Sequence, residues 1–300
     1  MLQINLSLLC ISLFFINEVS SYLEARGDGL YYGGQKVFLS GANYAWHNYG
    51  QDFGDGHYFS ESQAFYERWL DEIASAGGNS VRFWLHVEGY VTPKFDANGY
   101  VISGDNQGTL KEELKTFLDA ARQRNIFVVP VLWNGAYLTN QNAINLVWDE
   151  SKLQSYIDNA LKPLVSAVSN HPALAAWEIV NEPEGSIRVG VSNSNPCFDT
   201  TPISNSGAGW TGLSIPIENW LKFINRQIDA IRSVDPAMLA TQGAWSERSQ
   251  TNVCADCHNY FSDDCLIAAG GRPGGTIDFY QMHTYSWQSQ YSPYSPLKVL

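Results

Sequence analysis

Short apolar segments alternate with longer amphipathic segments along most of the chain. The apolar segments are residues 37–43, 80–85, 126–132, 174–180, 238–241 and 277–282. Several of them, such as 126–132 (IFVVPVL), are apolar at nearly every position. Strands that are apolar on both faces are typical of a parallel sheet with helices packed against it.

The amphipathic segments predict helices at residues 62–76, 110–124, 151–169, 217–234 and 258–269. In the second of these, Leu110, Leu114 and Leu118 recur at helical spacing on one side. Repeated βα units predict the α/β class, either a (β/α)8 TIM barrel or a doubly wound sheet. No GxGxxG or GxxxxGK[ST] motif follows the first strand, which favours the barrel. Neither an internal repeat nor a linker divides residues 22–300, so we expect a single domain there.

Residues 1–21 are set apart as a predicted secretory signal peptide. The run Leu6 to Ile16 is apolar or small throughout, and Val19-Ser20-Ser21 has the spacing of a signal-peptidase site. The run is shorter than the roughly 20 residues that span a bilayer. A basic residue before it is missing, so a buried helix or an uncleaved anchor remains the alternative. The prediction is a secreted, extracellular protein.

Composition and charge limit the kinds of molecule that the protein is expected to bind. Hydrophobic residues make up 45% of the 300 positions, which is typical of a folded domain. The formal net charge of −12 argues against nucleic acid and against an anionic membrane surface, both of which favour a basic face. The chain is also rich in aromatic residues, with 10 Trp and 16 Tyr.

Four cysteines follow the predicted signal: Cys197, Cys254, Cys257 and Cys265. In an oxidising compartment an even number predicts two disulfides, and four cysteines allow three pairings. The sequence does not choose among these pairings. Cys254-Ala-Asp-Cys257 followed by His258 could instead be half of a zinc or redox site, although a structural zinc site usually has two such pairs. No metal and no cofactor is predicted.

Polar and aromatic residues collect where the predicted strands end, which is where barrel enzymes place their chemistry. They include Trp46, Arg82, Trp84, His86, Trp133, Asn134, Asn181, Glu182, Trp245, His283 and Tyr285. The most specific pattern is Trp177 to Pro183 (WEIVNEP). Pro183 cannot continue a strand, so Glu182 should lie at the tip of the fourth strand, beside Asn181. The alternative is that Glu182 caps the next segment or pairs with an arginine.

WEIVNEP resembles the fourth-strand signature of glycoside hydrolase family 5, a family of (β/α)8 retaining glycosidases. Four further stretches agree with it: GANYAWHNYG at 41–50, NSVRFWLHVEG at 79–89, VVPVLWNGA at 128–136 and QMHTYSW at 281–287. Over roughly residues 22–300 the set is most similar to the invertebrate endo-β-1,4-mannanases of this family. The resemblance implies a polysaccharide substrate, mannan or galactomannan, and a monomer when full length.

The resemblance also implies roles for individual residues. Glu182 would be the acid/base, with a raised pKa, and Asn181 would hydrogen-bond the 2-OH of the sugar at the point of cleavage. Arg82 would lie beneath the nucleophile, and His283 and Tyr285 would flank the two carboxylates. The substrate-binding surface would comprise Trp46, Trp84, His86, Trp133, Asn134 and Trp245.

The nucleophile of this family is a second glutamate, at the end of strand seven. No glutamate follows Glu247 here, and about six βα units are recognisable in the sequence. Glu178 lies roughly 13 Å from Glu182 along the strand, too far to replace the nucleophile. We therefore expect that these residues form part of a barrel lacking strands seven and eight, and that activity needs the longer protein. Three alternatives remain: an endo-β-1,4-glucanase, an exo-mannosidase, or a non-catalytic mannan-binding protein.

Overall fold

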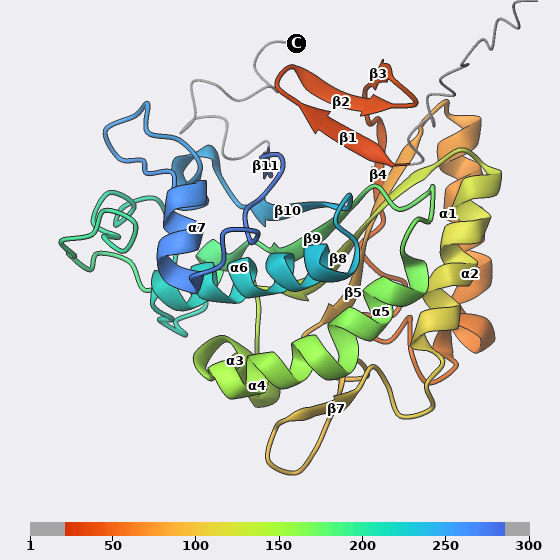
Figure 1. Cartoon of the computed structure of the whole chain (residues 1–300), viewed down its shortest axis with the longest axis horizontal. Helices are drawn as coiled ribbons and strands as arrows, with labels where there is room; N and C mark the ends of the chain where they lie inside the picture. The colour runs from red at the N-terminus through yellow and green to blue at the C-terminus, as the bar shows by residue number, and fades with distance from the viewer. Residues whose placement is uncertain (1–21, 286–300) are drawn as a thin grey trace, which may run out of the picture.

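The computed structural model describes residues 22–285, and the predicted signal peptide at 1–21 lies outside them. One curved parallel sheet forms the centre of the molecule (Figure 1). Its strands, in spatial order, are β4 (Gly41–Asn43), β5 (Ser80–Val87), β8 (Phe127–Asn134), β9 (Ala176–Asn181), β10 (Leu239–Ala244) and β11 (Gln281–Met282). Spatial order follows chain order and every neighbouring pair is parallel, as in part of a (β/α)8 barrel.

Helices cover the outer face of this sheet. They are α1 (Gln63–Ser75), α2 (Leu110–Gln123), α5 (Lys162–Val168), α6 (Ile217–Val234) and α7 (Asp263–Gly270), and consecutive members of this series contact one another. The apolar side of α2, including Leu114, Phe117 and Leu118, is fully buried against the sheet. The alternation seen in the sequence therefore gives the predicted fold class, because each amphipathic helix buries its apolar side on the strands.

A small antiparallel sheet was not predicted. It consists of β1 (Leu23–Arg26), β2 (Gly29–Tyr32) and β3 (Gln35–Val37). Its apolar side chains, Leu23 among them, pack on Ala175, Ala176 and Leu239 at the amino ends of the parallel strands. The segment 37–43, predicted as one strand, is divided because Val37 belongs to this cover and Gly41–Asn43 to the barrel. The small sheet covers the amino ends of the parallel strands and leaves their carboxyl ends uncovered by it.

The remaining elements refine the predicted boundaries. The predicted helix at 151–169 consists of α4 (Glu150–Tyr156), η2 (Ile157–Leu161) and α5. The hairpin β6 (Lys94–Phe95) and β7 (Val101–Ser103), the helix α3 (Gln141–Trp148) and the turns η1 (Tyr58–Ser62), η3 (Pro183–Ser186) and η4 (Glu247–Ser249) were not predicted. They follow strands, as loops at a barrel mouth do. Among residues 22–285, no helix is both long and apolar enough to cross a membrane.

Candidate active site

Glu182 lies directly after β9, and its backbone has the left-handed conformation, with φ +45° and ψ +59°. Such a conformation is uncommon for a residue with a side chain and often marks a functional position. The Glu182 carboxylate accepts hydrogen bonds from Tyr285 Oη at 2.7 Å and His283 Nδ1 at 2.5 Å. His283 and Tyr285 follow β11, and Tyr285 lies 103 residues after Glu182 in the sequence.

The pKa of Glu182 differs from the expectation. Burial raises it, but the hydrogen bonds from His283 and Tyr285, with the charge of nearby Arg82, outweigh burial and place it below the usual value. The predicted raised pKa is therefore not what residues 22–285 produce, because the donors around Glu182 stabilise its charged form. A second carboxylate placed beside it would act in the opposite direction.

Arg82, on β5, is the centre of a polar layer inside the curved sheet. Its Nε donates to Glu178 Oε2 at 2.7 Å and its Nη2 to Glu178 Oε1 at 2.5 Å. Nη2 also donates to Asn181 Oδ1 at 2.9 Å, and Nη1 to Asn43 Oδ1 at 3.1 Å. The carboxylate that pairs with Arg82 in the described residues is thus Glu178, which is fully buried. The pairing of Arg82 with Glu178 was not predicted from the sequence.

Gly243 on β10 makes this ion pair possible. A Cβ at position 243 would lie 2.1 Å from Glu178 Oε1 and 3.3 Å from Arg82 Nη2. Only glycine therefore lets β10 approach the buried pair closely. Gln281 Nε2 on β11 also donates to Glu178 Oε2, at 2.7 Å. Side chains from β4, β5, β9 and β11 therefore belong to one charged layer.

Two pairs of tryptophans lie near the ends of the strands, and one of them is beside Arg82. Trp46 and Trp84 have ring centroids 5.0 Å apart. The Arg82 guanidinium carbon lies over the Trp84 ring, 5.7 Å from its centroid. Trp245 packs at 5.3 Å against Trp210, a residue that was not predicted. Trp210 is 44% exposed and donates its indole N–H to Ala136 O at 2.8 Å. Its loop, between β9 and α6, carried no periodic signal, and only the number of tryptophans pointed to such a residue.

Two predicted sugar-binding residues belong to the core instead. His86 is fully buried and bonds Thr92 and Tyr156. Burial lowers the pKa of His86 to about 3, so it is neutral. Trp133 is 2% exposed and donates to Gln227 on α6 at 3.1 Å. His86 bonds Tyr156 on α4 and Trp133 bonds Gln227 on α6, so both side chains point between the sheet and the helices. Strict alternation would place His86 on the face of Arg82, but the register of β5 with β8 shifts between Trp84 and Val87. Among residues 22–285 both side chains are thus part of the core, and their contact with substrate stays a prediction.

Glu184, two residues after Glu182, was also missed. Its carboxylate accepts from Ser249 Oγ at 2.5 Å and from the Trp245 backbone N–H at 3.2 Å. Burial is the main reason that its pKa rises to about 7, and the charge of Glu182 acts in the same direction. Glu184 thus joins the turn η3 to the loop that carries Trp245. A carboxylate inside NEPEG is a visible signal, but its partners are 61 and 65 residues away.

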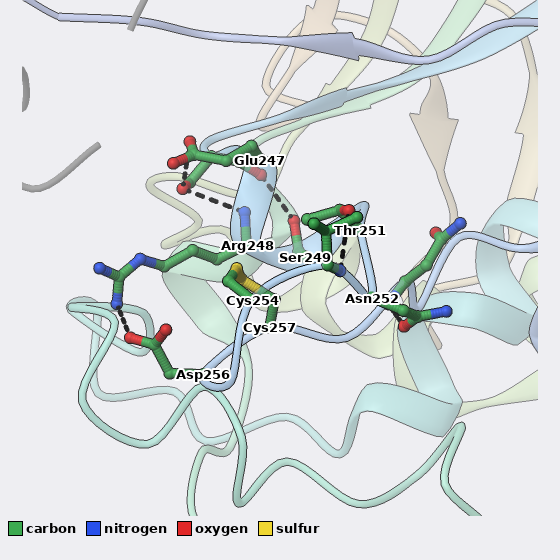
Figure 2. Close-up of a disulfide and its surroundings, with 11 residues drawn as sticks. Glu247, Arg248, Ser249, Thr251, Asn252, Cys254, Asp256 and Cys257 are labelled. Atoms are coloured by element: carbon green, nitrogen blue, oxygen red, sulfur yellow. Dashed lines mark hydrogen bonds and ion pairs between the residues drawn. A yellow bond between two sulfur atoms is a disulfide. The ribbon is translucent and has the colours of Figure 1, made fainter. Parts of the chain in front are cut away.

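The cysteines form two pairs outside this cluster. Cys197 pairs with Cys265, with Cα atoms 5.1 Å apart, and Cys254 pairs with Cys257. Figure 2 shows the second pair on the loop after η4, beside the Arg248–Asp256 ion pair. The sulfur atoms that the alternative zinc reading required are thus bonded to each other.

A carboxylate held by a histidine and a tyrosine at the carboxyl end of a parallel barrel strand is typical of the class of barrel glycoside hydrolases. Residues 40–295 match the model of the Cellulase family, glycosyl hydrolase family 5. The chain belongs to this family.

Several related proteins are similar over most of this chain and over 72–78% of their own length. The endo-1,4-β-mannanase from Eisenia fetida is 49% identical, with a TM-score of 0.89, over 92% of this chain and 76% of that one. The mannan endo-1,4-β-mannosidase of Cryptopygus antarcticus is 48% identical over 93% of this chain and 72% of its own length. The β-mannanase of Mytilus edulis is 47% identical, with a TM-score of 0.88, over 93% and 78%.

Proposed function

We propose that this protein is an endo-acting glycoside hydrolase that cleaves β-1,4-mannosidic linkages in mannan and galactomannan, with retention of configuration. The observation that carries the proposal is Glu182 at the tip of β9, held by His283 and Tyr285 beside the fixed amide of Asn181. Relatives that are 46–48% identical and bear the name mannan endo-1,4-β-mannosidase support the choice of substrate.

The proposed reaction is a double displacement. A carboxylate nucleophile attacks the anomeric carbon while Glu182 gives its proton to the glycosidic oxygen, which leaves as an alcohol. Glu182 then removes a proton from water, and the resulting hydroxide displaces the nucleophile from the sugar. The family resemblance places the nucleophile on a seventh barrel strand, which is not among the strands of residues 22–285. The proposal therefore concerns the full-length protein that carries both carboxylates.

A reducing-sugar assay of the full-length protein tests the proposal. We expect hydrolysis of galactomannan, and a loss of at least about 100-fold in kcat for Glu182→Gln, because the amide cannot transfer a proton. Glu247→Gln is the matched control, since Glu247 lies in η4 and its carboxylate accepts from Ser246 Oγ rather than from the cluster. Faster hydrolysis of carboxymethylcellulose would favour the glucanase alternative. Binding of mannan without hydrolysis would favour the non-catalytic one, and release of mannose alone the exo-mannosidase.

We also infer that the protein is secreted. The apolar segment at 6–16 supports this inference, as do the two cysteine pairs, because disulfides persist in oxidising compartments. Detection of the mature protein in the medium of expressing cells, beginning after residue 21, would test it. Retention in the cytosol with residues 1–21 attached would contradict it.

A further inference from the structure

Glu88 is a buried carboxylate that the proposed reaction does not use. It follows β5 and is 1% exposed. One of its oxygens accepts from Tyr49 Oη at 2.7 Å, and the other accepts from Thr139 N at 2.7 Å and Thr139 Oγ1 at 2.6 Å. Tyr49 lies in the loop after β4, and Thr139 lies after β8. A single negative group therefore connects the loops that follow three adjacent strands.

A chain of hydrogen bonds leads from Glu88 to the active site. Asn134 Nδ2 donates to Tyr49 Oη at 3.2 Å, and Asn181 Nδ2 donates to Asn134 Oδ1 at 3.0 Å. The chain ends where Arg82 Nη2 donates to Asn181 Oδ1 at 2.9 Å. All members except Tyr49 and Arg82 are at least 97% buried, so bulk water cannot substitute for a missing partner.

The two ends of this chain fix the direction of every bond within it. A guanidinium can only donate, so Asn181 must present Oδ1 to Arg82 and an N–H to Asn134. Asn134 then presents its oxygen to Asn181 and an N–H to Tyr49. The Tyr49 hydroxyl, which accepts that N–H, must give its own proton to Glu88, because an ionised carboxylate can only accept.

Glu88 also acts on Asn134 through the loop after β8. Asn134 Oδ1 accepts from Ala136 N at 3.1 Å, and Asn134 Nδ2 donates to Tyr137 O at 3.1 Å. Thr139, held by Glu88, ends this same short segment. The carboxylate therefore supports the orientation of Asn134 both through the Tyr49 hydroxyl and through the backbone around it.

We propose that Glu88 is a positioning residue that, through Tyr49 and Asn134, fixes the amide of Asn181 so that an N–H faces the 2-OH of the sugar being cleaved. This inference rests on the proposed function, in which Asn181 contacts that hydroxyl. Contacts to the 2-OH strengthen in the transition state of retaining glycosidases, so a loss of orientation should lower kcat more than it raises KM.

The test compares Glu88→Gln and Tyr49→Phe in the full-length protein. A glutamine has one acceptor oxygen, and the two donors of Thr139 compete for it, which leaves an NH2 group facing the Tyr49 hydroxyl. Tyr49→Phe removes that hydroxyl but keeps Glu88 on Thr139. We expect each variant to lose about tenfold in kcat with little change in KM. A tenfold loss in rate corresponds to the net contribution of about one hydrogen bond. The double variant should lose no more than either single variant, because both interrupt the same chain.

Tyr90→Phe is the matched control. Tyr90 is 58% exposed, and its hydroxyl forms a hydrogen bond with Thr139 Oγ1 at 2.7 Å. Tyr90→Phe removes a hydroxyl group that bonds Thr139, but it leaves the hydrogen bonds between Glu88 and Asn181 in place. We expect kcat within about twofold of the wild-type value.

A second substrate separates positioning from loss of fold. The rates are compared on an aryl β-mannobioside and on its analogue that lacks the 2-OH beside the scissile bond. Wild type should lose rate on the deoxy analogue, whereas Glu88→Gln and Tyr49→Phe should match wild type there. Equal tenfold losses on both substrates, additive losses in the double variant, or wild-type kcat in both single variants would overturn the inference. Absence of hydrolysis by wild type would instead overturn the proposed function.

Discussion

Glu184 gives the protein a pH-dependent stability that one substitution can isolate. Its carboxyl is 1% exposed, and burial raises its pKa from 4.5 to about 7. Below pH 4.5 the group is protonated in both the native and the unfolded state. Between pH 4.5 and about 7 the unfolded state loses this proton while the native state keeps it, so native stability falls as pH rises. Above about pH 7 the group is ionised in both states, and native stability no longer falls through this group.

The magnitude follows from the two pKa values. A pKa raised from 4.5 to about 7 corresponds to about 3 kcal/mol of unfolding free energy. For a chain of 300 residues this is a shift of about 5 °C in Tm. Glu184→Gln removes the titration. Its stability relative to wild type should therefore improve by about 3 kcal/mol between pH 4 and pH 8, whatever the substitution costs in lost hydrogen bonds.

Denaturant unfolding of both proteins at several pH values provides the measurement. Taking the difference between them cancels the titration of all other groups that the substitution leaves unchanged. Ser249→Ala is an informative second variant, because the hydroxyl of Ser249 bonds the Glu184 carboxylate and lowers its pKa. Its removal should widen the pH range over which stability is lost. A difference between wild type and Glu184→Gln that stays constant from pH 4 to pH 8 would refute the reasoning.

Two further predictions concern stability. Arg82→Met should destabilise the fold by about 3–5 kcal/mol in urea unfolding, because it leaves Glu178 charged and unpaired, and adding Glu178→Met should recover most of that loss. No recovery in the double variant would contradict this account. Cys197→Ser, which opens a loop of 68 residues, should cost about 4 kcal/mol, against about 1.5 kcal/mol for Cys254→Ser, whose partner is 3 residues away. Equal losses in the two serine variants would show that loop length is not the cause.

Periodicity in the sequence was sufficient to predict a parallel sheet covered by helices, and the absence of a nucleotide-binding motif favoured the barrel over a doubly wound sheet. The apolar run of β8 and the helical spacing of α2 are local patterns, and burial of both apolar faces leaves few arrangements other than helices on a parallel sheet. WEIVNEP likewise located Glu182, because a strand and the proline that ends it are read from adjacent residues. The cover formed by β1 to β3 was missed, since its short strands are stabilised by contacts with the amino ends of the barrel strands.

Tertiary structure decided the partners of each charge and the face of each side chain. Arg82 and Glu178 are 96 residues apart, and no local pattern indicates that they pair. His86 and Trp133 stand near strand ends, as sugar-binding residues do, but the register of β5 with β8 shifts between Trp84 and Val87, which no local pattern indicates, and both side chains bond residues of α4 and α6. The lowered pKa of Glu182 depends on donors brought from a distant segment, and the raised pKa of Glu184 depends on its burial. Sequence thus determined the fold class and the position of Glu182 at a strand end, whereas long-range packing determined the electrostatics around it, because hydrogen bonds and burial act through space.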